Sequence, residues 1–268
     1  MAVPLSDLIQ DWHDETAGLE NILSQLTAEE WQRPTPAPGW DVGHQIAHLT
    51  WTDKALLQAL SSPTEFAVLR DIVTADVEGT VNEAAAAGAR VAPKAILNNW
   101  VSGQRRTAEL LSGVDPTLKL PWFGPPMGPA AAISARIMET FAHGQDVRDA
   151  LGLPPIRSPR LRHIAHLAVA ARPYSFHANG LQEPSGPVRV ELDFNGQIWT
   201  WGPEDAVERV TGDALDFALM ATRRRHWNDC DVRAAGNEAQ KWLEVIQAYA
   251  GPPGTGRKPL RQESTRIR

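Results

Sequence analysis

The chain has 268 residues, 43% of them hydrophobic and 22% charged, which excludes a disordered chain and predicts one large domain or two modest ones. Its formal net charge of -6 argues against non-specific binding to nucleic acid, and no apolar run is long enough to span a membrane. A single cysteine, Cys230, and an N-terminus without a basic or apolar leader segment favour a cytoplasmic protein.

The first half of the chain is predicted to be helical. Apolar residues recur at helical spacing over residues 5–26, and further helices are expected after Asp41 and Pro63 and from Pro93 onward. The helix after Pro63 is expected to fade into the alanine-rich segment 84–87. Segments 34–39 and 120–128 must be loops, because their prolines do not fit a helix interior. With a last long helix over residues 129–151, the pattern predicts a helical bundle.

The second half has a different pattern, which predicts an α+β domain. After a proline-containing linker and a helix over residues 161–171, two alternating segments, 188–194 and 197–201, flank Asn195 and Gly196, a strong hairpin signal. Asp213 and Asn237 are expected to cap two further helices, with a short strand starting at Asp231 between them. We divide the chain into a helical bundle (1–153), an α+β domain (154–253) and a flexible tail (254–268).

Two pairs of side chains at helical spacing point to a metal site. Glu139 and His143 lie four residues apart on the last long helix, and their apolar neighbours predict that both face inward. A surface pair without a metal is the alternative. On the helix after Asp41, His44 and His48 have the same spacing, but His44 lies in the first turn, where capping is at least as good an explanation. With His48 as third ligand, a position stays open for water or substrate, as in catalytic sites.

Aromatic residues near these positions are candidate walls of a cofactor pocket. Trp122 and Phe123 lie in the loop that precedes the last long helix, where aromatic side chains commonly cover a site. Trp40 is a further candidate, whereas Trp51 is better explained by core packing. Asp146, one turn past the second ligand of its helix, either orients that imidazole or forms a surface salt bridge.

Two segments and the two-part layout resemble the mycothiol-dependent maleylpyruvate isomerase superfamily. The segments are WDVGHQIAH at 40–48 and RIMETFAHGQD at 136–146. Members of this superfamily join a DinB-like, metal-binding four-helix bundle to a C-terminal domain similar to sterol carrier proteins. The resemblance covers nearly the whole chain, and the segments around 121–127 and 200–203 are more similar to a separate branch of the superfamily than to the isomerase itself.

The resemblance implies a mainly α fold, with a DinB-like four-helix bundle followed by a smaller α+β, sterol-carrier-like domain. It implies that His48, Glu139 and His143 hold a metal ion, usually zinc in the family, although iron or nickel also suits these ligands. It implies mycothiol as co-substrate. Family members carry an arginine after an apolar helix that helps to position an anionic substrate or thiol, and Arg224 is the nearest counterpart. An equal alternative for the three arginines at 223–225 is that they form a basic helix C-terminus, where their positive charge interacts favourably with the helix dipole.

The expected activity is that of a metal-dependent enzyme that uses mycothiol to isomerise, or to transfer the thiol to, a small conjugated or anionic molecule. Two alternatives stay open: a metal-dependent hydrolase that needs no thiol, and a non-enzymatic protein that binds an apolar ligand while the metal clamps the bundle. We expect a small molecule and a small thiol as partners, and neither nucleic acid nor a membrane.

Overall fold

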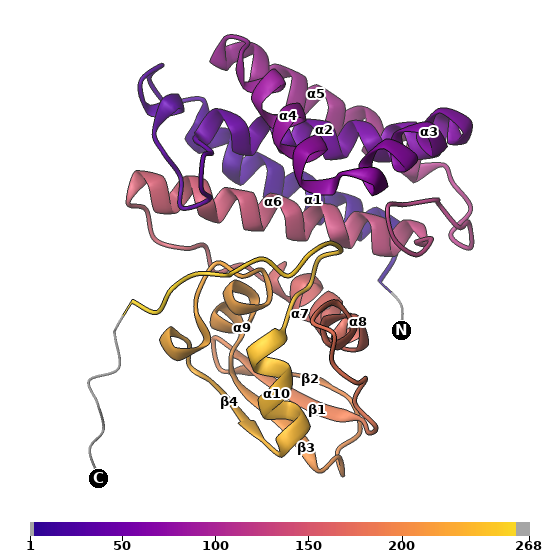
Figure 1. Ribbon diagram of the computed structural model, residues 1–268, viewed down its shortest axis with the longest axis vertical. Coiled ribbons are helices and arrows are strands. Elements are labelled where there is room, and N and C mark those ends of the chain that lie inside the picture. Colours follow the sequence, from indigo (N-terminus) through magenta and orange to yellow (C-terminus); the bar gives the residue numbers. More distant parts are fainter. Residues whose placement is uncertain (1–2, 261–268) are drawn as a thin grey trace. The chain divides into compact units, whose positions relative to one another are not determined.

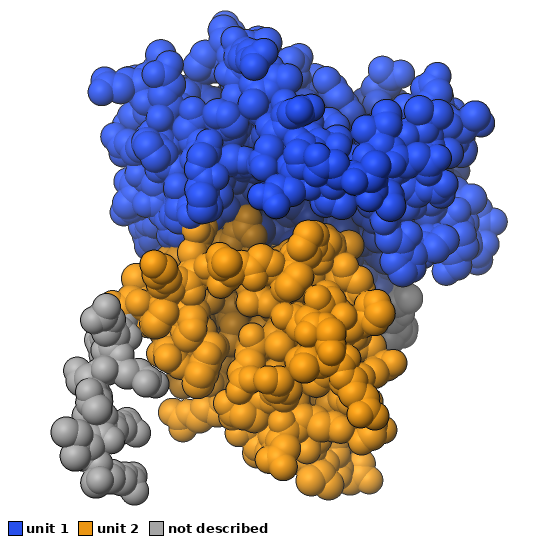
Figure 2. Space-filling view, in the orientation of Figure 1, with its two compact units in different colours: residues 1–155 blue, residues 156–268 orange. Residues whose placement is uncertain are grey.

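The structure is a computed structural model that describes residues 3–260. The chain divides into two compact units, Met1–Pro155 and Ile156–Arg268, which are coloured separately in Figure 2. The first unit is helical and the second combines helices with a four-stranded sheet, so the predicted mainly α fold class is confirmed. Of the predicted flexible tail, residues 261–268 lie outside the described part of the chain.

Four long helices form the bundle of the first unit (Figure 1). Helix α1 (Leu5–Leu23) packs on α5 (Pro93–Ser112) and α6 (Pro129–Leu151), and α2 (Val42–Ser61) packs on the same two helices. Local sequence sets where these helices begin. The side chain of Asp41 accepts a hydrogen bond from the first turn of α2, and a proline occupies the first position of α5 and of α6.

Two shorter helices and a 3-10 turn complete this unit. They are η1 (Glu30–Gln32), α3 (Pro63–Ala75) and α4 (Val77–Ala89). The expectation that helix structure fades at residues 84–87 is wrong, because these alanines lie inside α4. Small side chains let α4 approach α2 closely: a Cβ added at Gly88 would lie 2.7 Å from that of Ala47.

Two apolar clusters leave a polar stretch between them along α2 and α6. One cluster contains buried apolar side chains of α2 from Ala55 onward and of α6 up to Ile137. Trp12 and Phe66 belong to the same cluster. The other includes α2 residues up to Leu49, and Val147 of α6. The stretch between them carries Asp53 of α2 and Glu139 and His143 of α6, and His48 lies next to Leu49 at its edge, so packed side chains fix both helices on either side of these groups.

The second unit contains four helices and one mixed sheet within the described residues (Figure 1). The strands β1 (Val188–Phe194), β2 (Gln197–Trp201), β3 (Glu208–Asp213) and β4 (Val232–Ala235) have the order β2-β1-β3-β4. Only the β1–β3 pair is parallel. The helices are α7 (Leu161–Ala170), α8 (Arg172–Ala178), α9 (Ala214–Ala221) and α10 (Asn237–Val245), and η2 (Trp227–Asp229) is a 3-10 turn.

The sequence predicted the hairpin β1–β2 and the Asp213 cap of α9, and both are confirmed. It missed β3 and α8. Strand β3 buries a single apolar side chain, Val210, so its sequence has no alternating pattern to recognise. The last helix begins at Asn237, with Gly236 rather than Asn237 at the cap position. No described helix is both long and apolar enough to cross a membrane.

A close backbone approach makes Gly202 a sensitive position in the second unit. Its φ is +77°, and a Cβ there would collide with the carbonyl oxygen of Val188. Gly196 also has a positive φ, +85°, but has open space around its missing Cβ. We expect Gly196→Ala to lower the free energy of unfolding by about 1–2 kcal/mol and Gly202→Ala by about 3 kcal/mol or more. Urea denaturation of the two variants measures the difference, and equal losses would contradict the collision.

Candidate metal centre

Helices α2 and α6 bring together the three side chains that the sequence predicted as metal ligands. Ligand atoms of His48, Glu139 and His143 all lie within 4.8 Å of one another. Nε2 of His143 is 3.2 Å from Oε2 of Glu139, and the ring centroids of His48 and His143 are 4.6 Å apart. The side chains of Glu139 and His143 are 19% and 11% exposed, so they are shielded from bulk water without being sealed from it.

The chemistry and spacing of these atoms fit a divalent cation. Zinc binds imidazole nitrogen and carboxylate oxygen at about 2.0–2.2 Å, so two ligands of a tetrahedral ion lie about 3.4 Å apart. The 3.2 Å between Nε2 of His143 and Oε2 of Glu139 matches this spacing, and a ligand atom of His48 lies within 4.8 Å of both. Three ligands leave one tetrahedral position for another molecule.

His44, the alternative histidine of α2, has a capping role. Its backbone nitrogen donates to Oδ1 of Asp41 over 2.9 Å, and its Nδ1 lies 2.6 Å from the same oxygen. The two residues form a reciprocal capping box at the start of α2. The choice of His48 over His44 as the candidate ligand therefore agrees with the geometry.

Gln45 contacts the outer nitrogen of His143. Its Oε1 lies 2.5 Å from Nδ1 of His143, and Gln45 is fully buried. The sequence suggested Asp146 for this role; the contact observed at Nδ1 comes from Gln45 on the facing helix, and a role for Asp146 stays a prediction. Asp146 itself is buried, with 1% of its surface exposed. A glutamine within a helix carries no sequence signal that would have identified this contact.

Trp40 forms an aromatic cover over the imidazoles. Its ring centroid is 5.3 Å from that of His48 and 6.1 Å from that of His143, with the second pair stacked. Nε1 of Trp40 donates a hydrogen bond to Oδ1 of Asn82 over 2.9 Å, which ties the indole to α4. The sequence proposed Trp40 as a pocket wall but did not identify Asn82 as its anchor.

A buried charge cluster adjoins the ligands. The guanidinium of Arg136 lies between two carboxylates, with Nη1 3.8 Å from Oδ1 of Asp53 and Nη2 4.0 Å from Oε1 of Glu139. Burial raises the pKa of Asp53 to about 7, although Arg136 opposes the shift. Burial would also raise the pKa of Glu139, but hydrogen bonding to His143 and the charge of Arg136 outweigh it and hold that pKa well below its usual value. Glu139 is therefore ionised, as a metal ligand must be.

Trp122 and Phe123, the predicted cofactor-binding residues, differ in their surroundings. Trp122 is 9% exposed, stacks on Phe66 and lies under the guanidinium of Arg136, so it is mainly a core residue. Phe123 is half-buried and stacks on Trp51 at 5.8 Å between centroids, and Trp51 in turn contacts the ring of His48 at 6.1 Å. Of the two, Phe123 is connected to the ligands through its stacking on Trp51, which contacts His48. Cofactor binding by either residue stays a prediction.

The remaining candidates lie in the second unit. Arg224 is half-buried, and its Nη1 donates to the carbonyl oxygen of Thr222 over 2.7 Å. Its catalytic role stays a prediction. Arg223 has a φ of +61° at the second position after α9, just past the C-cap residue Thr222, where glycine is usual. Burial and the nearby charge of Asp216 raise the pKa of Cys230 to about 12, which favours the protonated, poorly nucleophilic thiol.

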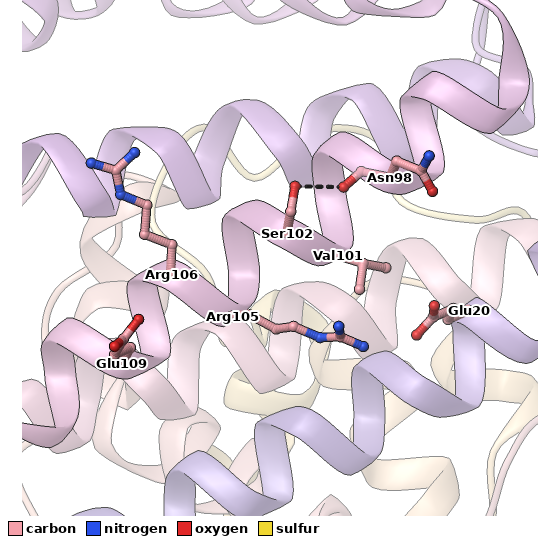
Figure 3. A pocket seen from close by; sticks show the side chains of 7 residues that line it. All are labelled: Glu20, Asn98, Val101, Ser102, Arg105, Arg106 and Glu109. Carbon is pink, nitrogen blue, oxygen red and sulfur yellow. Dashed lines mark hydrogen bonds between the residues drawn. The ribbon is translucent and has the colours of Figure 1, made fainter.

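A separate hollow of about 540 Å³ lies between α1 and α5 (Figure 3). Its lining contains none of the candidate ligands. Apart from the buried Val101 and half-buried Glu20, the lining residues are exposed and carry mixed charges: Asn98, Ser102, Arg105, Arg106 and Glu109. A solvated surface of this kind lacks the apolar walls of a typical small-molecule site.

The fold and the cluster together define a two-unit protein whose helical bundle carries three side chains suited to one metal ion. Residues 12–148 match the family described as the mycothiol maleylpyruvate isomerase N-terminal domain, and this chain belongs to that family. Residues 184–235 match a second family description, wyosine base formation.

Two Mycobacterium tuberculosis proteins are similar along nearly the whole chain. They are uncharacterized protein MT0041 of strain CDC 1551 and uncharacterized protein Rv0036c of strain H37Rv, each 46% identical over 250 residues, or 93% of this chain and 97% of theirs. A crystal structure of the mycothiol-dependent maleylpyruvate isomerase has the same fold, with a TM-score of 0.61 and 16% identity over 87% of this chain and 93% of that one. A mutant of that enzyme gives a TM-score of 0.59 and 15% identity.

Proposed function

We propose that this protein is a metal-dependent enzyme that uses a low-molecular-weight thiol, mycothiol, to isomerise or thiolate a small conjugated or anionic substrate. The observation that carries the proposal is the His48, Glu139 and His143 cluster, whose ligand atoms lie within 4.8 Å of one another. Family membership supports the thiol, because the matched family is named for a mycothiol-dependent isomerase.

Zinc is the proposed ion, since two imidazoles and one carboxylate suit it. When bound, such an ion supplies a positive charge that favours the thiolate over the thiol and stabilises negative charge on a substrate oxygen. The chain itself keeps Glu139 ionised and places one imidazole on each helix. Trp40 covers the imidazoles and restricts the access of water from its side.

The proposed isomerisation needs only addition and elimination of the thiol. The thiolate sulfur adds to one carbon of a conjugated double bond, which becomes a single bond and rotates; the carbon–sulfur bond then breaks and the double bond re-forms. In a transfer reaction the same sulfur displaces a leaving group. Phe123 and Trp122 are the proposed aromatic walls for the thiol, and Arg224 is the proposed partner for an anionic group, in line with its family counterpart.

Cobalt-substituted protein offers a direct test. Mycothiol added to the cobalt protein is expected to produce a sulfur-to-cobalt charge-transfer band, and the S-methylated thiol, which cannot ionise, is the matched control. Turnover is then followed on a panel of small conjugated acids with and without mycothiol.

Three results would contradict the proposal in different ways. If the protein holds no stoichiometric metal, either as purified or after reconstitution, both the thiol-dependent enzyme and the metal-dependent hydrolase are excluded. Turnover that is unchanged when mycothiol is omitted favours the metal-dependent hydrolase. Bound metal without turnover of any substrate in the panel, combined with loss of folding on removal of the metal, favours the non-enzymatic role in which the metal clamps the bundle.

A further inference from the structure

The proline-rich segment 34–39 has no role in the site as described so far, yet it makes one end of a hydrogen-bond chain that leads to His143. The segment closes on itself through a bridge between Pro34 and Asp41. Within it, the backbone nitrogen and the side-chain oxygen of Thr35 each lie 2.8 Å from the carbonyl oxygen of Trp40. Three prolines at 34, 36 and 38 limit the backbone freedom of this loop.

The direction of every hydrogen bond in the chain follows from its first member. The carbonyl oxygen of Trp40 can only accept, so the single hydroxyl hydrogen of Thr35 is used there. The oxygen of Thr35 must then accept in its 2.9 Å contact with the side chain of Gln45, which places the amide nitrogen of Gln45 toward Thr35.

The same orientation aims the amide oxygen of Gln45 at Nδ1 of His143, at 2.5 Å. An amide oxygen cannot donate, so Nδ1 of His143 carries a hydrogen. Nε2 is the ring nitrogen that faces Glu139, and a neutral ring with hydrogen on Nδ1 leaves its lone pair on Nε2. This is the tautomer that a metal ligand needs.

We propose that Thr35 and Gln45 are positioning residues that hold His143 in its metal-binding tautomer and orientation. The proposal rests on the metal site proposed above. It extends that site to two residues that are not ligands themselves, Thr35 in the loop and Gln45 on the facing helix. Gln45 is suited to the task because it is fully buried and cannot exchange its partners for bulk water.

The test compares zinc affinity, measured by competition with a chelator, in Gln45→Leu and Gln104→Leu. Both glutamines are buried in the bundle, but Gln104 contacts His13 instead of a ligand. We expect Gln45→Leu to weaken zinc binding by about 10–100-fold and Gln104→Leu to leave it unchanged. Gln45→Glu keeps the acceptor and is expected to restore most of the affinity.

A spectroscopic readout separates positioning from loss of stability. In the zinc-loaded protein, the Nδ1 hydrogen of His143 is expected to give a slowly exchanging NMR signal that disappears in Gln45→Leu. If that variant does not fold, Thr35→Val tests the same chain from the loop, with Thr35→Ser as control; we expect weaker zinc binding only in Thr35→Val.

The outcomes distinguish this inference from the proposed function. Tight zinc binding by both the native protein and Gln45→Leu, or an unchanged Nδ1 signal in that variant, would overturn the positioning role and leave the proposed function intact. A native protein that binds zinc and loses it in Gln45→Leu, but shows no thiol-dependent turnover, would support the positioning role while the proposed function fails. No zinc binding by the native protein would overturn both.

Discussion

If the proposed function holds, replacing Glu139 with alanine is expected to prevent stoichiometric zinc binding and to abolish the proposed thiol-dependent activity. Structural zinc sites contribute about 10–16 kcal/mol in total, so one of three protein ligands accounts for about 3–5 kcal/mol, or about a 10²–10⁴-fold loss of affinity. His48→Ala and His143→Ala should have effects of the same size, since the three ligand atoms lie within 4.8 Å of one another. Chelator competition and metal analysis of the purified variants measure the loss.

His44 provides a matched control on the same helix, one turn before His48. Its ring caps α2 through Asp41, so His44→Ala should lower the free energy of unfolding by about 1 kcal/mol and leave zinc affinity unchanged. Equal zinc affinity in His44→Ala and His48→Ala would contradict the assignment of the ligands.

The second large effect is expected at the buried Arg136. Arg136 is 3% exposed, and its guanidinium lies between the carboxylates of Asp53 and Glu139. Removing one partner of a buried ion pair leaves an uncompensated charge, which typically costs about 3–5 kcal/mol. We therefore expect Arg136→Met to lose about that much stability at pH 8 in the metal-free protein, measured by urea denaturation.

The loss should be smaller at pH 6, because Asp53 can take up a proton. Its pKa is about 7 in the folded protein and 3.8 as the unperturbed reference, so the folded state binds more protons than the unfolded state between these values. The protonated carboxyl of Asp53 therefore adds to the free energy of unfolding at low pH, and this contribution is lost as the pH rises through about 7. Without Arg136, whose charge lowers this pKa, the decline should extend to higher pH.

The double variant Asp53→Asn/Arg136→Met gives the control for this explanation. It lacks both the carboxylate of Asp53 and the guanidinium, while Glu139 keeps its contact with His143, so it should recover most of the stability that Arg136→Met loses and should lose the pH dependence assigned to Asp53. A double variant no more stable than Arg136→Met at pH 8 would show that the loss comes from packing on Trp122 rather than from the charge.

Local sequence was enough to predict the helices that carry the site. The cap at Asp41 and the prolines at 93 and 129 define where α2, α5 and α6 begin, and the four-residue spacing of Glu139 and His143 places both on one face of α6. Such signals act within one turn of a helix, so they can be recognised without knowing what packs against it. The hairpin at Asn195 is predictable for the same reason.

Contacts between distant segments could not be predicted in this way. The bond of Gln45 to His143 joins residues 98 positions apart, and nothing near Gln45 in the sequence distinguishes it from an exposed helical glutamine. Strand β3 has one buried apolar side chain and is defined by the strands on either side of it.

The sequence by itself determined the helical bundle, the α+β second unit and the three candidate ligands, because capping, periodicity and helical spacing are short-range properties. Only the tertiary structure decided which polar groups surround those ligands: Gln45 on His143, Arg136 between Asp53 and Glu139, and Asn82 on Trp40. These pairings depend on how helices pack, and packing fixes the partners of a buried polar group through distances that no local pattern encodes.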